Sequence, residues 1–221
     1  MSNLLSANSA QNRGAVCARI SIMQDPHAQL TPPVLLLATP QVMDPFFHKS
    51  VVFLVNHEDR GSAGFIVNRA TDSRVAEVLR GMGIPWKGPE DSRVYFGGPV
   101  QPHLGTVLFE SQELSIPLAE GEETPSEAFK GVRLSRDAAS LARIALAPPA
   151  SFRLFLGYAG WGAGQLVEEV LRNDWLVAPL NKELLFTAKP EQAWEEGIRG
   201  MGLDPEALAT WVSGSPKGPV N

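Results

Sequence analysis

The sequence has a single cysteine, Cys17, among its 221 residues. One cysteine excludes an intramolecular disulfide framework and a zinc site built from several thiolates, and it is typical of a reducing compartment. Basic residues are also few, because 19 lysines and arginines stand against 24 acids and give a formal net charge of −5. An acidic chain of this kind does not capture nucleic acid through a broad electropositive surface.

Long hydrophobic runs are absent as well. Apolar stretches such as Val34–Ala38 and Val51–Val55 have the length of a strand, far below the roughly 20 residues that a membrane span needs. Residues 1–23 contain Arg13 and Arg19 without an acid, but they show neither the apolar region of a secretory signal nor the amphipathic repeat of a transit segment. We therefore expect a cytoplasmic protein with no membrane partner, and a disordered tail over residues 1–29.

The chain does contain enough apolar residues to fill a core. Hydrophobic residues make up 44% of this 23.9 kDa chain, a size typical of one domain. The 20 glycines and 18 prolines exceed the usual share, and at this hydrophobicity they indicate many turns rather than disorder. We predict a single domain over residues 30–213, followed by a C-terminal tail over residues 214–221.

Hydrophobic periodicity and turn residues predict the elements of that domain. Helices are expected after caps at Asp72 and Ser135, and two terminal helices with proline in the first turn close the domain. Strands come in runs between helices, which favours an α+β class, a single layered domain with a mixed, largely antiparallel sheet flanked by helices. The predicted strands are Val34–Ala38, Ser50–Asn56, Gly64–Asn68, Arg93–Phe96, Thr106–Glu110, Phe152–Leu156, Trp175–Val177 and Leu184–Phe186, and the later helices are Ala163–Arg172, Pro190–Arg199 and Pro205–Val212.

A glycine-rich segment follows the predicted strand Phe152–Leu156 and precedes a helix. It reads Gly157-Tyr158-Ala159-Gly160-Trp161-Gly162-Ala163-Gly164-Gln165. A glycine loop at a helix N-terminus offers exposed amides to an anion. The spacing matches neither a P-loop nor a dinucleotide fingerprint, however. The alternative is that the glycines permit a tight turn against which Tyr158 and Trp161 pack.

Four ordered motifs over about residues 30–212 resemble the YqgE/AlgH family. The glycine-rich segment with Asn173-Asp-Trp-Leu176 is one; the others are Asp44-Pro45-x-Phe47-x-Lys49-Ser50-Val51-Val52 followed by His57, then Gly64-Phe-Ile-Val-Asn68-Arg69, and Tyr95-Phe96-Gly97-Gly98-Pro99-Val100. The resemblance implies a compact bacterial α+β domain with no established catalytic activity, and one branch of the family is described as a regulator of alginate production. Where the family usually has proline and glutamate, this sequence has Ala70 and Asn56, and the second change weakens a Glu-His acid–base pair.

Two further motifs hold candidate binding residues. The Asn68-Arg69 pair at a strand end suits a carboxylate or phosphate, since arginine presents a fork of donors; the alternative is that Arg69 holds the 56–63 loop through backbone carbonyls. Gly97-Gly98 lets the backbone pass close to a neighbour, or simply makes a tight strand exit. Gln165 is suited equally to capping a helix and to holding a ligand.

Catalytic and metal-binding patterns find little support. His48, His57 and His103 are scattered, and His57 begins a zincin-like motif that lacks its second histidine, so no metal is expected. No Gly-x-Ser-x-Gly elbow is present, and no cofactor motif is complete. Trp175 and Trp194 are interpreted as core residues.

Direct DNA reading is also disfavoured. The pair of terminal helices resembles a helix-turn-helix, but residues 190–213 contain five acids and one base, Arg199. A recognition helix needs basic and amide side chains to reach phosphates and base edges.

Our leading hypothesis is a non-enzymatic regulatory or ligand-binding protein, an indirect regulator whose partner is an anionic small molecule or a protein. The site is expected where three motifs converge, with Asn68, Arg69, Gly97, Gly98, Tyr158, Gly160, Trp161, Gly162, Gly164 and Gln165 as ligand-binding residues. An alternative is an enzyme that acts on an anionic small molecule, with Arg69 as clamp and His57 as acid and base. A third hypothesis is a protein-interaction module that uses the acidic segment 110–127.

Overall fold

The computed structural model of the chain describes residues 26–111 and 125–208. Ten strands form a curled sheet with the order β10-β1-β2-β3-β9-β6-β8-β7, and β4 and β5 join it beside β9. Every strand pair is antiparallel except β5 with β9. The strands are β1 Val34–Ala38, β2 Val51–Glu58, β3 Gly61–Ile66, β4 Ala70–Arg74, β5 Arg93–Phe96, β6 Val100–Glu110, β7 Ser126–Phe129, β8 Val132–Ser135, β9 Phe152–Gly162 and β10 Trp175–Pro179.

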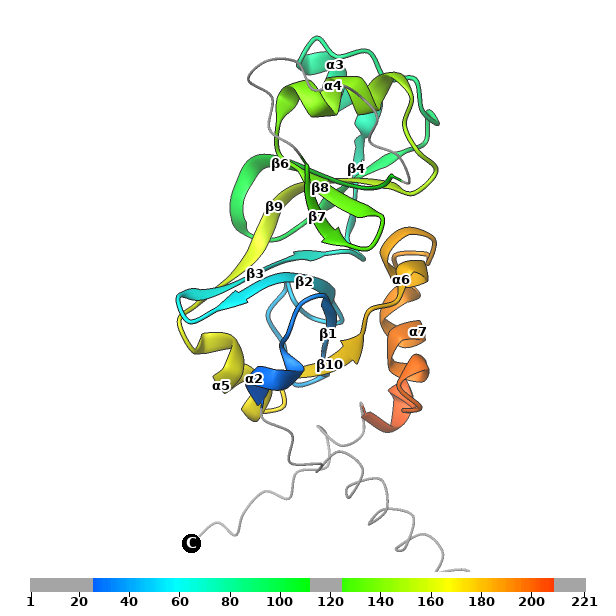
Figure 1. Cartoon of the computed structure of the whole chain (residues 1–221). Coiled ribbons are helices and arrows are strands. Elements are labelled where there is room, and N and C mark those ends of the chain that lie inside the picture. The colour runs from blue at the N-terminus through cyan, green and yellow to red at the C-terminus, as the bar shows by residue number, and fades with distance from the viewer. Residues whose placement is uncertain (1–25, 112–124, 209–221) are drawn as a thin grey trace, which may run out of the picture.

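Six described helices cover this sheet, which confirms the predicted α+β class (Figure 1). One end of the molecule carries α3 and α4, the opposite end carries α2 and α5, and α6 and α7 lie along one side (Figure 1). The helices are α2 Pro26–Gln29, α3 Val75–Gly81, α4 Ala138–Leu146, α5 Gln165–Leu171, α6 Lys182–Phe186 and α7 Ala193–Gly200.

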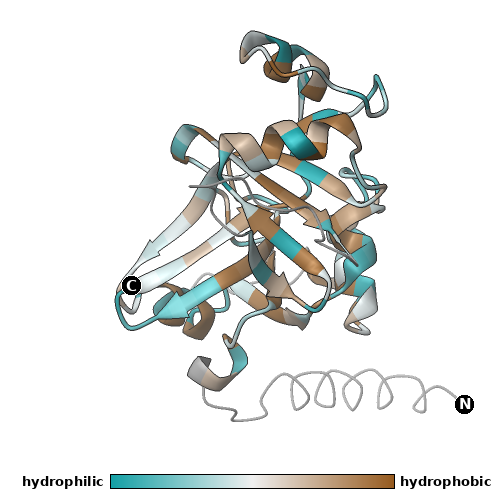
Figure 2. Ribbon diagram, turned by 45° about the horizontal axis from the view of Figure 1, so that its top comes forward, coloured by the Kyte–Doolittle hydropathy of each residue, from teal (hydrophilic) through white to brown (hydrophobic). Residues whose placement is uncertain are grey.

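Buried apolar side chains form three clusters, one under each group of helices. The largest cluster contains Phe53 and Phe155 and is covered by α6 and α7. A second, on the opposite face, contains Trp161 and Trp175 with Leu166 of α5. The third packs the strands against α3 and α4. Figure 2 shows the same arrangement, with hydrophobic colour concentrated on the strands in the middle of the body.

Strand β9 joins the two halves of the sheet. It pairs with β6 and β5 along its first half and with β3 from Ala159 to Gly162. Gly157, with φ of +71°, lies between the halves. There the backbones come so close that a Cβ on Gly97 would lie 2.3 Å from the Gly157 carbonyl oxygen. Glycine at these positions therefore serves the crossing of two strands.

Several sequence-based predictions are wrong in detail. Leu184–Phe186 belongs to α6 rather than to a strand, because Asn181 caps a helix there by accepting a hydrogen bond from the Glu183 N–H at 2.8 Å. The α3 cap is Arg74 rather than Asp72, since residues 70–74 pair with β5 as β4. The α4 cap is Asp137 rather than Ser135.

Other elements were missed or shifted. The predicted tail 1–29 lies outside the described residues up to residue 25, and α2 forms over its last four residues. Most of the acidic segment 110–127 also lies outside them, while its end begins the unpredicted β7–β8 hairpin. Helix α7 starts at Ala193, three residues after the proline expected in its first turn. Of the last predicted helix, the structure describes residues 205–208 as helical.

Candidate functional site

The glycine-rich segment is mostly strand rather than loop. Residues 159–162 pair with β3, opposite Gly61 to Gly64, and a Cβ on Gly61 would lie 2.4 Å from the Trp161 carbonyl oxygen. The turn into α5 is confined to Ala163 and Gly164, and Gly164 is the helix N-cap with φ of +73°. The predicted anion loop therefore supplies a strand edge and a short turn, and α5 after it is seven residues long.

A carboxylate on α5 ties this strand to its neighbour. Glu169 Oε2 accepts hydrogen bonds from Trp161 Nε1 and Trp175 Nε1, both at 2.8 Å. Its Oε1 accepts a third from Gln165 Nε2 at 2.9 Å, and Gln165 Oε1 in turn accepts from the Gly162 N–H at 3.0 Å. Because both tryptophans are nearly fully buried, this carboxylate satisfies two indole donors that water does not reach easily.

The loop of residues 39–50, between β1 and β2, faces the two indoles. Asp44 Oδ1 accepts hydrogen bonds from the Phe46 and Phe47 N–H groups at 2.8 and 3.2 Å, which fixes a tight turn. The turn directs the Phe47 ring edge-on to Trp175 at 5.8 Å and tilted against Trp161 at 6.4 Å. The indoles themselves meet edge to face at 5.9 Å, so three rings form one aromatic cluster.

Asn68 and Arg69 fix the C-terminal end of this loop through hydrogen bonds to its backbone. Asn68 Nδ2 donates to the Lys49 carbonyl at 2.9 Å, and its Oδ1 accepts from the Val51 N–H at 2.8 Å. Arg69 Nη2 donates to the His48 carbonyl. The sequence-based alternative for Arg69 named carbonyls of the 56–63 loop, and the structure corrects this to the 39–50 loop.

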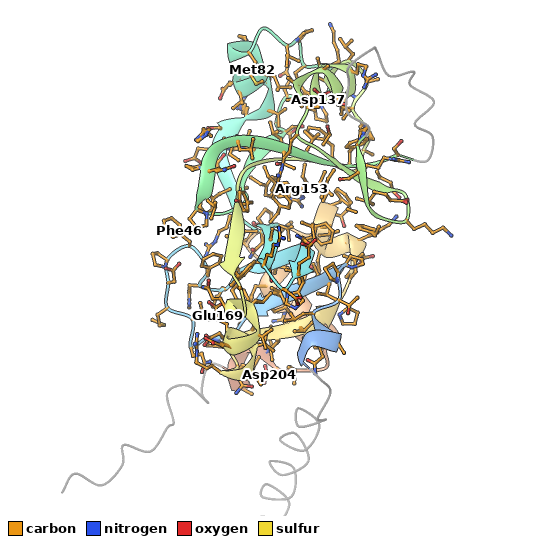
Figure 3. All side chains as sticks on the ribbon, turned by 60° about the vertical axis from the view of Figure 1, so that its left-hand side comes forward. Phe46, Met82, Asp137, Arg153, Glu169 and Asp204 are labelled. Atoms are coloured by element: carbon orange, nitrogen blue, oxygen red, sulfur yellow. The ribbon has the colours of Figure 1, made fainter. Side chains whose placement is uncertain are left out.

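These elements enclose a cavity of about 380 Å³, which we call the indole pocket. Its walls combine aromatic and apolar side chains with three carboxylates and two side-chain amides. No lysine or arginine is among its lining residues. Figure 3 shows Glu169 at the α5 end of the molecule. The lining residues are Gln41, Val42, Met43, Asp44, Phe47, Gly160, Trp161, Gln165, Glu169, Asp174 and Trp175.

Asp174, another carboxylate of the pocket, already forms an ion pair with an arginine. Its Oδ2 accepts from Arg172 Nη2 at 2.7 Å, and its Oδ1 accepts from Gln41 Nε2 at 2.9 Å. The hydrogen bond that Arg172 donates to Asp174 raises the pKa of the Arg172 guanidinium above its ordinary value. The donors to Glu169, in contrast, are all neutral. Glu169 and Asp44 are therefore the pocket carboxylates without a hydrogen-bonded side-chain cation among the described residues, and Arg172 acts on Glu169 through electrostatic attraction alone.

The structure divides the predicted ligand-binding residues among three places. Gly160, Trp161 and Gln165 line the indole pocket, while Gly162 and Gly164 adjoin it through Gln165 and the α5 cap. Gly97 and Gly98 contact the backbone of Gly157 and Tyr158 at the strand crossing. Asn68 and Arg69 reach the pocket indirectly, through the 39–50 loop.

Tyr158 faces the opposite side of the sheet from Trp161. There the Arg136 guanidinium lies 5.7 Å from the Tyr158 ring centre and donates from Nε to Thr106 Oγ1 at 3.3 Å. Arg136 and Thr106 line a second cavity of about 420 Å³, next to the end of β7. Tyr158 itself lines neither this cavity nor the indole pocket.

His57, the acid and base of the alternative hypothesis, lies on the β2–β3 hairpin. Its Nδ1 forms a hydrogen bond of 2.7 Å with Ser62 Oγ. Neither His57 nor Arg69 is among the residues that line the indole pocket. Within the described ranges, no group of three or more histidine, cysteine or acidic side chains is arranged to hold a metal ion. None of the helices described is long and apolar enough to cross a membrane.

The prediction that Trp175 and Trp194 are core residues is confirmed, since both are almost fully buried. The sequence patterns did not identify Glu169 as a site residue, because its role depends on Trp161 and Trp175 lying beside it in the fold. One signal was available, because Gln165 and Glu169 are four residues apart and so lie on one helix face. Asp44, Phe47 and Asp174 also occur inside the motifs that carry the family resemblance, although no binding role was predicted for them.

Comparison with known proteins gives consistent results. The sequence profile of a family described as AlgH-like, DUF179, matches residues 35–206. A UPF0301 protein from Magnetococcus marinus is 37% identical over 178 residues, which cover 78% of this chain and 90% of that protein. Another from Myxococcus xanthus is 36% identical, with coverage of 80% and 93%.

Solved structures agree with the fold. The solution structure of the AlgH protein from Pseudomonas aeruginosa matches with a TM-score of 0.64 at 28% identity, and covers 86% of this chain and 98% of that one. A crystal structure of a protein from Corynebacterium diphtheriae matches with a TM-score of 0.63 over 81% and 90% of the two chains. Its 22% identity supports the fold alone.

Proposed function

The chain belongs to the AlgH-like family, and from that premise we propose that it is a binding protein whose ligand places a cationic group on an apolar stem in the indole pocket. One observation carries the proposal. The Glu169 carboxylate is held between two indoles by three neutral N–H donors, at distances of 2.8 to 2.9 Å. Neutral donors fix the carboxylate in place without cancelling its charge.

The walls of the pocket suit the same ligand. Aromatic rings attract a guanidinium or ammonium group, by about 0.5 to 2 kcal/mol depending on how far the cation is desolvated. A hydrogen bond to a charged group adds roughly 1.5 to 3 kcal/mol. A carboxylate or phosphate would instead meet Asp44, Glu169 and Asp174. The geometry therefore favours a cation over the anionic ligand that the sequence suggested.

A regulatory role would be indirect in this proposal, through ligand-dependent contact with another protein. The described residues after Pro190 remain predominantly acidic, and their base, Arg199, is paired with Glu195 at 2.9 Å. The enzymatic alternative is less well supported, because the Arg69 guanidinium donates to the His48 carbonyl and not to an open cleft.

The test is a titration of the full chain with N-acetyl-arginine amide, followed through the indole Nε1–H resonances. We expect Trp161 and Trp175 to shift with a Kd in the millimolar range, as for a fragment of this size. Glu169→Gln keeps an acceptor for the indoles but removes the charge, and it should weaken binding about tenfold.

Two controls make this result specific. Glu168→Gln removes the same charge one residue away, outside the pocket lining, and should leave the Kd unchanged within about twofold. N-acetyl-citrulline amide has nearly the same shape without the charge and should not bind measurably. Equal binding of both amides, or equal losses in the two variants, would contradict the proposal.

A further inference from the structure

The rim of the indole pocket leaves large apolar side chains exposed. Met43 is 75% exposed and Phe46 is 47% exposed, both on the 39–50 loop. The Phe46 ring stacks on Phe96 at 5.6 Å, so the neighbouring strand holds it in place. Figure 3 shows Phe46 at the edge of the molecule. Side chains held in exposed positions beside a pocket are typical of an interaction surface.

The charge of this surface selects the partner. Its cavity is lined by Asp44, Glu169 and Asp174, and by no lysine or arginine. Arg172, the basic residue nearest in sequence to Asp174, forms a salt bridge with it, with Nη2 at 2.7 Å from Oδ2. A complementary segment is therefore basic, with apolar residues beside its cation.

Such a segment exists in the same chain. Residues 1–24 contain two bases, Arg13 and Arg19, and no acid, and Arg19 is followed by Ile20 and Ile22. These residues precede the region that matches the AlgH-like family, which begins at residue 35. Their composition pairs a cation with apolar neighbours, as the pocket and its rim require.

The attachment point is also close to the pocket. The described chain begins with α2, which contacts α5, the helix that carries Gln165 and Glu169. Leu30, just after α2, is buried in the same cluster as Trp161. Six residues lie between Arg19 and Pro26, so the two Cα atoms are seven residue steps apart, and an extended chain of seven steps spans up to about 25 Å. A seven-residue helix such as α5 is about 10 Å long, so Arg19 can reach the pocket.

We propose that the N-terminal segment of this chain docks in the indole pocket, with Arg19 directed at Glu169 and Asp44 and its apolar neighbours against Met43 and Phe46. The proposal rests on the proposed function, since it uses the same pocket and the same ligand chemistry. A tethered segment has an effective concentration in the millimolar range for a short linker. The segment therefore competes with an external cation and sets the concentration at which that ligand binds.

The single cysteine provides the test, because Cys17 lies between the two arginines and accepts one spin label. In the labelled full chain, the indole Nε1–H signals of Trp161 and Trp175 should broaden. Trp86, which packs with Phe152 in the α3 and α4 cluster, serves as the internal reference. The attachment at α2 alone keeps the label near α5, so the deciding quantity is the difference between the wild type and a variant with Arg13→Gln and Arg19→Gln.

We expect the double variant to recover at least half of the lost signal intensity. Equal broadening in both proteins would overturn the proposal, and so would the absence of broadening in the wild type. Mixing labelled protein with isotope-enriched Cys17→Ser protein tests the other occupant, a second copy. Broadening across molecules as strong as that within one would overturn docking of the chain's own segment.

A second measurement separates this proposal from the proposed function. The double variant should bind N-acetyl-arginine amide about fivefold more tightly than the wild type, because the competing segment is weakened. Equal binding to both, still sensitive to Glu169→Gln, would overturn segment docking and leave the proposed function intact. No binding to either protein would overturn the proposed function itself.

Discussion

Two charged side chains in this protein, Glu169 on α5 and Arg153 on β9, are accommodated in opposite ways. Glu169 receives three hydrogen bonds from neutral N–H groups. Arg153 is 3% exposed, and its Nε and Nη1 atoms have no hydrogen-bond partner among the described residues. Its guanidinium lies 3.9 Å from the centre of the Tyr95 ring. In Figure 3, Glu169 lies at one end of the molecule and Arg153 near its middle.

The difference shows what each charge can do. Directional donors place the Glu169 carboxylate at a defined point beside a cavity, where a ligand can reach it. A ring face attracts the Arg153 cation but leaves its Nε and Nη1 hydrogens without an acceptor. Burial lowers the pKa of that guanidinium, while interaction with Tyr95 opposes the effect. Glu169 therefore has the features of a binding group, and Arg153 those of a charge buried in the core at a cost.

The largest expected effect comes from removing the Glu169 carboxylate. Glu169→Leu leaves two buried indole donors without an acceptor, and at roughly 1 to 3 kcal/mol for each unsatisfied group the free energy of unfolding should fall by about 3 kcal/mol. Glu169→Gln keeps one acceptor oxygen and should cost about 1 kcal/mol. Urea denaturation followed by tryptophan fluorescence measures both.

Glu168→Leu is the matched control for this prediction. Glu168 is an exposed residue on the same helix, so its substitution should change the free energy of unfolding by no more than about 0.5 kcal/mol. If the Glu168 and Glu169 variants were equally stable, the carboxylate would not be what holds the two indoles, and the contrast with Arg153 would disappear.

The next effect concerns Arg153. Arg153→Lys replaces a planar, weakly hydrated cation with a strongly hydrated ammonium that stacks poorly, so the free energy of unfolding should fall by about 2 kcal/mol. Arg153→Met removes the charge and keeps much of the volume, and its stability should lie within about 1 kcal/mol of the wild type, because uncharged replacements of buried ions are often neutral. Chemical denaturation of both variants gives the comparison.

Arg60→Lys, at the exposed β2–β3 turn, controls for the exchange itself and should have no measurable effect. A methionine variant less stable than the lysine variant would show that the cation–ring contact stabilises the core, and would contradict the interpretation of Arg153 as a charge buried at a cost in stability.

The sequence predicts the elements whose signal is local. The bounds of Val34–Ala38 and Arg93–Phe96 agree with β1 and β5, since each is a short apolar run between turn residues. Residues 157–162 were expected to form a loop because four glycines within eight residues suggest one. They form a strand because β3, which is itself rich in glycine, lies close beside them. The strand conformation of residues 159–162 therefore depends on pairing with residues 61–64, which lie about 100 residues earlier in the chain.

The site shows the same limit. Trp161 and Gln165 could be selected from one motif, and both line the indole pocket. The partnership of Glu169 with Trp175 needs β10 beside α5, and Phe47 reaches the indoles from a loop more than 100 residues earlier. Arg69 illustrates the reverse case. Its donor fork is visible in the sequence, but its carbonyl acceptor at His48 depends on how the 39–50 loop folds back.

The smallest expected effect on stability concerns Asp137, a second carboxylate that accepts hydrogen bonds from N–H groups, at the opposite end of the molecule from Glu169 (Figure 3). Asp137 caps α4 by accepting a hydrogen bond from the Ser140 N–H at 2.7 Å, and this bond holds the pKa of Asp137 below its ordinary value of 3.8. Asp137→Ala should lower the free energy of unfolding by about 1 kcal/mol at pH 7. Because the folded pKa is lowered, the stabilisation is present above pH 3.8 and is lost as the pH falls through the folded value.

Asp137→Asn separates the cap from the charge. Asparagine caps a helix about as well as aspartate, so this variant should match the wild type at pH 7. As the pH falls below 3.8, the wild type loses the contribution of its ionised cap, and the difference between the wild type and Asp137→Ala should shrink, whereas Asp137→Asn should keep its advantage over alanine. Urea denaturation at pH 7 and at about pH 3 measures this. If the difference in free energy of unfolding between the wild type and Asp137→Ala were the same at both pH values, the ionised and the protonated Asp137 side chain would cap α4 equally well. N–H donors alone would then not favour the ionised form of a carboxylate in this fold. The proposal for Glu169 depends on such donors leaving its carboxylate ionised.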